Sequence, residues 1–463
     1  MKLFKTILFI LLLTGLSVGY AEVSVAGKVA HVKGTLVAQR VDGTVNVLAE
    51  KSEVLAGDML ITAKDSYAEI IMNDGAQLTL RPHSNLRVEA FHFDQVSPQS
   101  DNMALRLLKG GFRTLSGLIG KRGNTGDFKL QAATANIGIR GTDFSTRLCG
   151  TQNCQDEGDA NKAQGKSRTL ESSVVGRVML VQGQFSAKQE DGKSRALTQG
   201  APVYEGDVLI TGASSNGLVG FRDESRISLQ ANTQFLVEKF KYDKGKGEEN
   251  SALRLLKGGV RVFSGWIGRV VHENFQFRVA TATIGIRGTG FDAWCNGPCA
   301  SDDQHPGGSP ELPLEGAGVY VWAGEVALMT GCDQAATCAT QIVGLQQSAI
   351  ISRDTGKPMP LPVVPQNIID NPAPRPDVLP IDLHEMFGSE FSGNPGVYLT
   401  VHSGEVSMTQ DGRVLILNQG ETGYGGAEGL LRLNLTPGFM GDDMNVNFNG
   451  IGNNMNNGGC MIH

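Results

Sequence analysis

The sequence has 463 residues, including 60 Gly, 17 Pro and 7 Cys, with 41 Lys plus Arg against 47 Asp plus Glu. A hydrophobic content of 40% and an aromatic content of 6% exclude a polytopic membrane protein and a long helical bundle, whereas abundant glycine favours turn-rich β structure. The net charge is -6 and no long basic run occurs, so we expect no nucleic-acid partner.

The first 21 residues predict a secretory signal peptide. Lys2 and Lys5 precede an apolar run from Ile7 to Leu13, and small residues lead to Ala21, after which we expect cleavage. The run is shorter than the roughly 20 residues of a membrane span, and no second apolar stretch approaches that length. We therefore expect a periplasmic or secreted protein without a membrane span after cleavage. An uncleaved anchor is the alternative.

Export makes disulfides the expected state of six cysteines that lie in close pairs. Spacings of four, three and five intervening residues do not suit zinc, so we predict no metal and no cofactor. Cys460 remains, as a free or intermolecular thiol. The predicted intrachain disulfides are Cys149 with Cys154, Cys295 with Cys299, and Cys332 with Cys338.

An internal duplication organises the chain. ALRLLKGGFRTLSGLIG, from Ala104, recurs as ALRLLKGGVRVFSGWIG, from Ala252, and ATANIGIRGTDF, from Ala133, recurs as ATATIGIRGTGF, from Ala280. Short stretches alternate apolar and polar residues, as in residues 67–72, and are broken by turn residues. The pattern predicts strands throughout, and the nearest candidate for a helix after the signal peptide is residues 382–389.

Two later segments, beginning at Gly318 and Gly396, share a hairpin pattern of Gly-Val-Tyr and then Gly-Glu-Val. The proline-rich stretch between them predicts an extended, largely exposed connector that joins no sheet. The first copy lacks such a hairpin, so we predict that the one at Gly396 returns to complete it, with the second copy inserted between. In the alternative, the opening hairpin at Gly176 serves both copies.

The expected segments are a signal peptide (1–21), domain 1 (22–156), domain 2 (172–299), a hairpin closing domain 2 (317–352), a Pro-rich linker (353–395), a hairpin completing domain 1 (396–425) and an Asn/Gly-rich tail (426–463).

The order of GDxLIT, LRLLKGG, ATAxIGIRGTxF and the closing hairpin resembles the FecR domain family. The resemblance covers most of residues 27–299, twice. It implies an all-β fold of two tandem domains, solenoid-like or twisted-sandwich in form, plus additional hairpins, and no catalytic centre. In ferric-citrate-type regulators such a domain relays a signal from an outer-membrane receptor through a membrane helix. This chain lacks such an internal helix and resembles the stand-alone exported group.

Two sets of cations are candidate binding residues. The repeated basic strand could hold an anionic envelope polymer, although solvent-facing strands also carry charge for solubility. In IGIRGT an arginine could grip a carboxylate or phosphate, or could serve only the fold, for instance by pairing with Asp143. The residues concerned are Arg106, Lys109, Arg113, Arg254, Lys257 and Arg261 on the basic strands, and Arg140 and Arg287 in the motif.

These observations favour a non-enzymatic exported protein that binds a protein or an anionic polymer or glycan of the cell envelope, in envelope signalling. A structural surface protein, in which the β units act as a spacer, is one alternative. A polysaccharide hydrolase is another, since carboxylates brought together from distant strands leave no sequence signature. The scattered histidines and the absence of a nucleophile elbow argue against catalysis.

Overall fold

Strands of alternating burial build both halves of the molecule in the computed structural model. In β6 (Tyr67–Met72), Ala68, Ile70 and Met72 are buried while their neighbours are not, as the sequence pattern predicts. Gly75, at φ +83°, forms the turn into β7 (Gln77–Leu80). The structure describes residues 24–122, 126–150, 170–171, 173–243, 247–279, 282–297, 316–331, 338–352, 355–364, 366–389 and 393–441.

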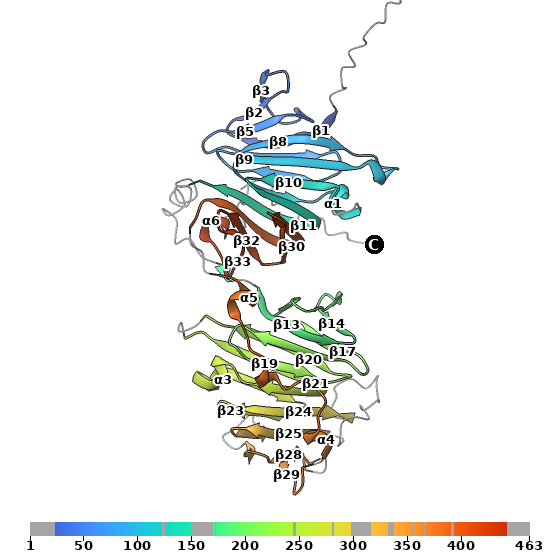
Figure 1. Cartoon of the computed structure of the whole chain (residues 1–463), viewed down its shortest axis with the longest axis vertical. Coiled ribbons are helices and arrows are strands. Elements are labelled where there is room, and N and C mark those ends of the chain that lie inside the picture. Colours follow the sequence, from blue (N-terminus) through green and yellow to red (C-terminus); the bar gives the residue numbers. More distant parts are fainter. Residues whose placement is uncertain are drawn as a thin grey trace, which may run out of the picture.

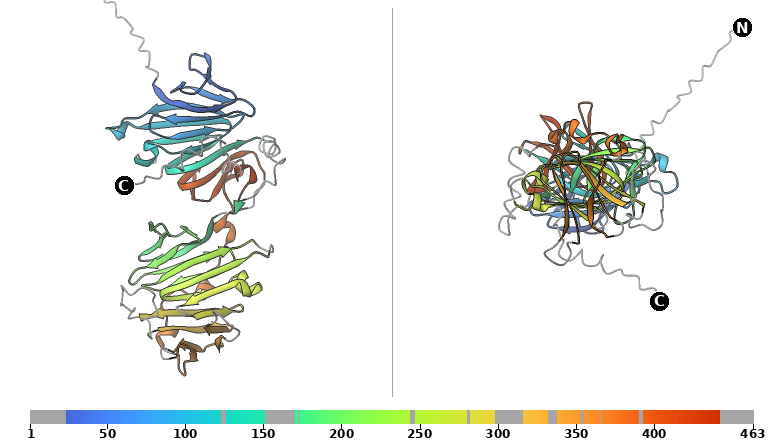
Figure 2. Two further views of the ribbon diagram at one scale, coloured as in Figure 1. Left: turned by 180° about the vertical axis from the view of Figure 1, so that it is seen from behind. Right: turned by 90° about the horizontal axis from the view of Figure 1, so that it is seen from below.

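The two halves are β domains stacked along the long axis, which confirms the all-β fold class (Figure 1). Each is a twisted stack of strands around its own apolar core. The view from behind shows the same two separate stacks, with red C-terminal strands beside the blue and cyan first domain (Figure 2, left). The remaining elements of the N-terminal part are β1 (Val25–Lys33), β2 (Leu36–Gln39), β3 (Val45–Leu48), β4 (Glu53–Leu55), β5 (Met59–Thr62), β8 (Asn85–His92), η1 (Pro98–Ser100), β9 (Asn102–Leu115), α1 (Leu118–Arg122), β10 (Phe128–Ala132) and β11 (Ala135–Cys149).

The first domain is completed by the C-terminal strands. β30 (Gly396–Gln410) lies antiparallel to β11, from the pair Asn136 and Thr409 to the pair Cys149 and Gly396. Val397, Leu399 and Val401 belong to the same core as the N-terminal strands. Residues 397–408 thus pair with the first repeat, as the nested interpretation requires. The strands that follow are β31 (Arg413–Asn418), β32 (Thr422–Gly426), β33 (Gly429–Leu433) and β34 (Leu435–Thr436), before α6 (Gly438–Gly441).

The second domain is continuous in sequence. β25 (Gly316–Ala323) and β26 (Val326–Thr330) pair with β24 and β23, which places the hairpin at Gly318 at the end of this domain. The other elements are β13 (Val174–Gln182), β14 (Phe185–Lys188), β15 (Ser194–Ala196), β16 (Pro202–Tyr204), β17 (Val208–Thr211), β18 (Asn216–Phe221), β19 (Arg226–Leu229), β20 (Gln234–Lys241), β21 (Asn250–Phe263), α3 (Trp266–Val270), η3 (His272–Asn274), β22 (Phe275–Val279), β23 (Ala282–Ile286), β24 (Gly290–Asn296), β27 (Ala339–Val343), β28 (Ser348–Ile351) and β29 (Pro358–Pro360).

The proline-rich connector differs from the expectation. β29 pairs with β28 as an outer strand, so the prediction that this stretch joins no sheet is wrong there. An edge position suits proline, because its missing N–H faces away from the ladder. Ile368 and Ala373 are buried against the second domain, so the connector is less exposed than predicted. It returns along that domain through α4 (Gln366–Ile369), η5 (Pro376–Val378) and α5 (Leu383–Phe387), the last within the predicted helix.

Candidate binding cleft between the domains

The basic strand of the first domain is only partly available to a ligand. Arg113 donates two hydrogen bonds to Asp143, of 2.9 and 2.6 Å. Arg106 forms an ion pair of 2.5 Å with Glu89, although its side chain is nearly half exposed. Lys109 is exposed in the middle of β9. Two of the three predicted cations therefore have carboxylate partners within the fold.

The equivalent strand of the second domain is more deeply covered. Arg261 is buried, with Nε 3.1 Å from Asp292 and Nη1 bonded to the carbonyl oxygens of Asn371 and Ala373 in the connector. Arg261 therefore fastens the connector, and no anionic ligand can reach it from solvent. Arg254 and Lys257 are half-buried on the same strand.

The IGIRGT motif has a clear structural part. Gly141 and Gly288 have φ values of +61° and +66°, which explains the second glycine of the motif in each copy. The backbone N–H groups of Thr142 and Thr289 each donate a hydrogen bond of 2.8 Å to the hydroxyl of a serine just after the long strand β9 or β21. The two motif arginines, Arg140 and Arg287, lie exposed beside these glycines. Asp143, the suggested partner of the motif arginine, accepts its hydrogen bonds from Arg113 instead.

The predicted disulfides cannot be followed in the structure. Cys154, Cys299, Cys332 and Cys460 lie outside the described residues, as does the predicted signal peptide. Across the described part of the chain, no group of three His, Cys, Asp or Glu side chains could hold a metal ion. No helix in that part is long and apolar enough to cross a membrane.

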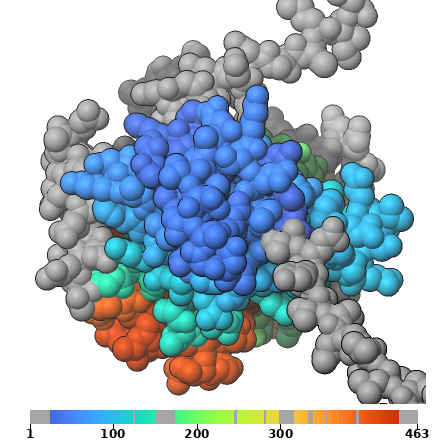
Figure 3. Space-filling view, turned by 90° about the horizontal axis from the view of Figure 1, so that it is seen from above, coloured from blue at the N-terminus to red at the C-terminus, as the bar shows by residue number. Residues whose placement is uncertain are grey.

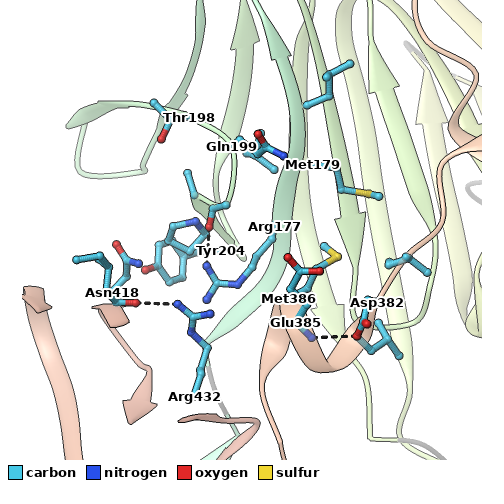
Figure 4. Close-up of a pocket in the computed structure, with 18 of the residues that line it drawn as sticks. Arg177, Met179, Thr198, Gln199, Tyr204, Asp382, Glu385, Met386, Asn418 and Arg432 are labelled. Atoms are coloured by element: carbon cyan, nitrogen blue, oxygen red, sulfur yellow. Dashed lines mark hydrogen bonds between the residues drawn. The ribbon is translucent and has the colours of Figure 1, made fainter. Parts of the chain in front are cut away.

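A cleft of about 1550 Å³ lies between the two domains. One wall is formed by β13 of the second domain, by β15 with the turn before it, and by the loop that leads to β16. The second wall is the closing hairpin of the first domain, β30–β31, and the third is the connector around α5. Figure 4 shows Arg177 and Arg432 approaching each other beside Tyr204, with Glu385 and Met386 of α5 on the other side. Side chains that line the cleft include Gln189, Arg195, Ala196, Thr198, Gln199, Asp382, His384, Glu385, Glu405, Ile416 and Asn418.

A buried carboxylate joins the two domains at the base of the cleft. Glu421, in the turn before β32, forms ion pairs with Arg177 of β13 and, at 3.1 Å, with Arg432 of β33. Its other oxygen accepts 2.8 Å from the backbone N–H of Asn418. Arg177 also donates 2.6 Å to the carbonyl oxygen of Gly200. We call Arg177, Glu421 and Arg432 the interdomain joint.

The electrostatics of the joint follow from burial. Removal from water, with the nearby charges of Arg432 and Arg222, lowers the pKa of Arg177 to about 9, so the group is still a cation at neutral pH. Burial likewise lowers the pKa of Arg432. A buried guanidinium group, of Arg177, and a half-buried one, of Arg432, thus share the Glu421 carboxylate, and loss of that carboxylate would leave both without their counter-charge.

Further contacts hold the domains in one orientation. The Tyr204 hydroxyl donates 3.1 Å to the carbonyl oxygen of Gln419. β12 (Leu170–Glu171), which precedes the second domain, pairs with β34 of the C-terminal strands. Arg222 lies over the Phe387 ring of α5, 4.6 Å from its centroid. The walls of the cleft are therefore fixed by side-chain, backbone and sheet contacts together.

The cleft suits a large ligand rather than a small cofactor. Its volume exceeds the roughly 300–1,000 Å³ that is usual for small-molecule pockets. Arg177, Arg195 and Arg432 are balanced by Asp382, Glu385 and Glu405, so the lining has no strong excess of either charge. Such a surface fits a polypeptide segment or an uncharged glycan better than a polyanion. The sequence did not predict the cleft, because its walls come from three segments that are far apart in the chain. Only the duplicated hairpin indicated that one of these segments returns to the first domain.

Comparison with known proteins finds one family match in each copy of the repeat. The model of the family described as FecR protein matches residues 58–161 and 207–305, one segment in each domain. No curated protein matches the chain. Among solved structures, a "putative anti-sigma factor" from Parabacteroides distasonis ATCC 8503 aligns at 15% identity and a TM-score of 0.23. That alignment covers 33% of this chain and 58% of the other, less than two thirds of its length.

Proposed function

We propose that this protein, which carries two segments that match the FecR model, is a non-enzymatic binding module of the cell envelope and takes part in envelope signalling. FecR is an envelope-associated, non-enzymatic family whose members relay signals to partners, which supports this role. The observation that carries the proposal is the interdomain cleft. A buried joint fixes its walls, and its size suits a segment of a partner macromolecule.

The proposal includes export. The signal-peptide pattern at the N-terminus supports a periplasmic or secreted location, where the three close cysteine pairs would form intrachain disulfides. Mass mapping of non-reduced peptides tests the pairing. We expect Cys149 linked to Cys154, and a crossed product such as Cys149 with Cys299 would contradict it.

Site-specific photocrosslinking in intact cells tests the cleft as the binding site. A photoreactive residue at Gln199 or Ile416, on opposite walls, should yield a crosslinked partner, which mass spectrometry identifies as protein or glycan. The matched control is Lys193, whose side chain is 83% exposed at the tip of the β14–β15 hairpin, just before the loop that holds Gln199, but outside the cleft. No crosslink from either wall, or an equal yield from Lys193, would contradict the proposal.

A structural spacer is the second candidate. The elongated shape and the fixed joint favour it, because a rigid stack holds its two ends at a constant separation (Figure 1). Cell fractionation separates the two roles. A spacer should be surface-bound or shed, whereas a partner of an envelope receptor should remain in the periplasm.

A further inference from the structure

The two ends of the molecule, away from the joint between the domains, expose apolar side chains. At the outer end of the first domain, Val41, Val45 and Val47 of the β2–β3 hairpin are 74%, 64% and 75% exposed. At the outer end of the second domain, Ile342 and Leu345 are 48% and 60% exposed. Figure 1 places β3 at one extreme of the long axis and β28–β29 at the other. Figure 3 looks onto the first of these ends, which the blue N-terminal strands form.

The duplication shows how the two kinds of end meet, because the joint is itself a contact between a closing end and an opening end. The opening hairpin of the second domain corresponds to β2–β3, at an offset of 149 residues that relates Gly34 to Gly183. The closing hairpin of the first domain, β30–β31, corresponds to β26–β27. In both, a side-chain carboxyl or amide oxygen, of Glu421 or Gln347, accepts from the backbone N–H three residues earlier.

Three of the residue pairs across the joint have compatible counterparts at the free ends. Tyr204, which donates a hydrogen bond to Gln419 at the joint, corresponds to Leu55. Gln419 corresponds to Leu345, so the free ends have an apolar pair at these two positions. Ala196 and Ile416, which line the two walls of the cleft, correspond to Val47 and Ile342. Arg177 and Glu421, which form an ion pair at the joint, correspond to Lys28 and Gln347. The Lys28 ammonium group can donate a charge-assisted hydrogen bond to the Gln347 amide oxygen.

We propose that the two ends dock head to tail between copies of this chain, the β2–β3 end of one copy against the β26–β27 end of the next. The free ends are more apolar than the equivalent hairpins beside the joint, since Val41 and Val45 stand where the second domain has Glu190 and Ser194, and Leu345 stands where the first domain has Gln419. Exposed apolar surface of this kind is costly in a monomer and marks an interaction site. Each contact joins two different surfaces, one from each end of the chain. A row of docked copies therefore keeps one free end of each type and can add further copies.

Sedimentation velocity of the mature full-length protein tests this in a Cys460→Ser background, which removes covalent linkage as a source of association. Wild-type chains should form species of at least twice the monomer mass as concentration rises. Val47→Glu and Leu345→Glu should each reduce the protein to monomer. Val414→Glu is the matched control, because Val414 is 61% exposed on β31 and lies at neither free end. It should associate like the wild type.

Mixing the two variants distinguishes docking from loss of folding. A Val47→Glu chain keeps its second-domain end, and a Leu345→Glu chain keeps its first-domain end. An equimolar mixture should therefore form a 1:1 dimer and nothing larger. Because apolar burial drives the contact, sulfate should strengthen it. A wild-type protein that is monomeric at every soluble concentration, variants that associate like the wild type, or a mixture that stays monomeric would each overturn the proposal.

Discussion

Glu421 is the residue on which the two domains converge. It is 2% exposed and lies between Arg177 from the second domain and Arg432 from the strands that complete the first. Breaking a buried ion pair by removing one partner costs about 3–5 kcal/mol, because the remaining charge is left buried without its counter-ion. The position therefore determines how rigidly the two domains are connected.

Glu421→Ala is expected to destabilise the folded protein by about 3 kcal/mol and to separate the unfolding of the two domains. Scanning calorimetry should then resolve two unfolding transitions, one for each domain. In the wild type the unfolding of the two domains should be more strongly coupled. Glu405→Ala is the control, since Glu405 lines the same cleft but is exposed. A Glu421→Ala protein with the stability and the transition profile of the Glu405→Ala protein would contradict the assignment of the joint.

His402 gives the completed first domain a dependence on pH. Its Nε2 lies 2.9 Å from the Ser145 hydroxyl of β11, and burial, with the nearby positive charge of Arg113, lowers its pKa below the usual 6.5. The folded state thus binds this proton less readily than the unfolded chain. Stability from this residue is present above pH 6.5 and is lost as pH falls through that value towards the folded pKa.

His402→Gln should flatten the decline of the unfolding free energy between pH 7.5 and pH 5, a window that spans the usual histidine pKa of about 6.5. Denaturant unfolding at several pH values measures the slope. Exposed His83, on the loop before β8, provides the control substitution His83→Gln. The explanation fails if His402→Gln retains the wild-type slope, or if the control removes it equally.

At the scale of the strand, β9 and β21 show why repeated cations need not be a ligand site. The sequence shows a basic strand twice, yet Arg113 and Arg261 each find an aspartate on the neighbouring strand. Those aspartates, Asp143 and Asp292, lie about 30 residues later and reach the arginines through strand pairing. Alternation of polar and apolar residues predicts on which face of the sheet a side chain lies. Which residue it contacts depends on the register between strands that are distant in sequence, and the pattern does not give that register.

Lys109 and Lys257 remain candidates for binding an anionic envelope polymer. If they bind it, the double variant Lys109→Glu with Lys257→Glu should weaken retention on purified lipopolysaccharide or peptidoglycan, and added salt should weaken wild-type retention, because exposed charges are screened over about 10 Å at 0.1 M. Lys193→Glu is a matched control on an exposed hairpin tip. Retention that responds to neither salt nor the double substitution would show that these strands are only solvated faces.

At the scale of the whole molecule, local and repeated features were predictable. Alternating burial, the turn at Gly75 and the return of the hairpin at Gly396 follow from period-two patterns and from comparing the two copies. The joint was not predictable from the repeat, because its residues are not repeated. In the other copy, Lys28 stands at the position of Arg177 and Gln347 at the position of Glu421. The course of the connector was also hidden, since its proline content predicts an extended chain but not the surface on which that chain lies.

The central structural claim is that the C-terminal strands complete the first domain around an inserted second domain and thereby form one wall of the cleft. Hydrogen exchange on a chain that ends at residue 395 tests it most directly. Without β30, peptides from residues 128–149 should lose most of their protection, because β11 loses its partner strand and the core loses Val397, Leu399 and Val401. Peptides from residues 250–279, in the continuous second domain, should keep theirs. Protection retained in 128–149, or lost equally in both regions, would contradict the account.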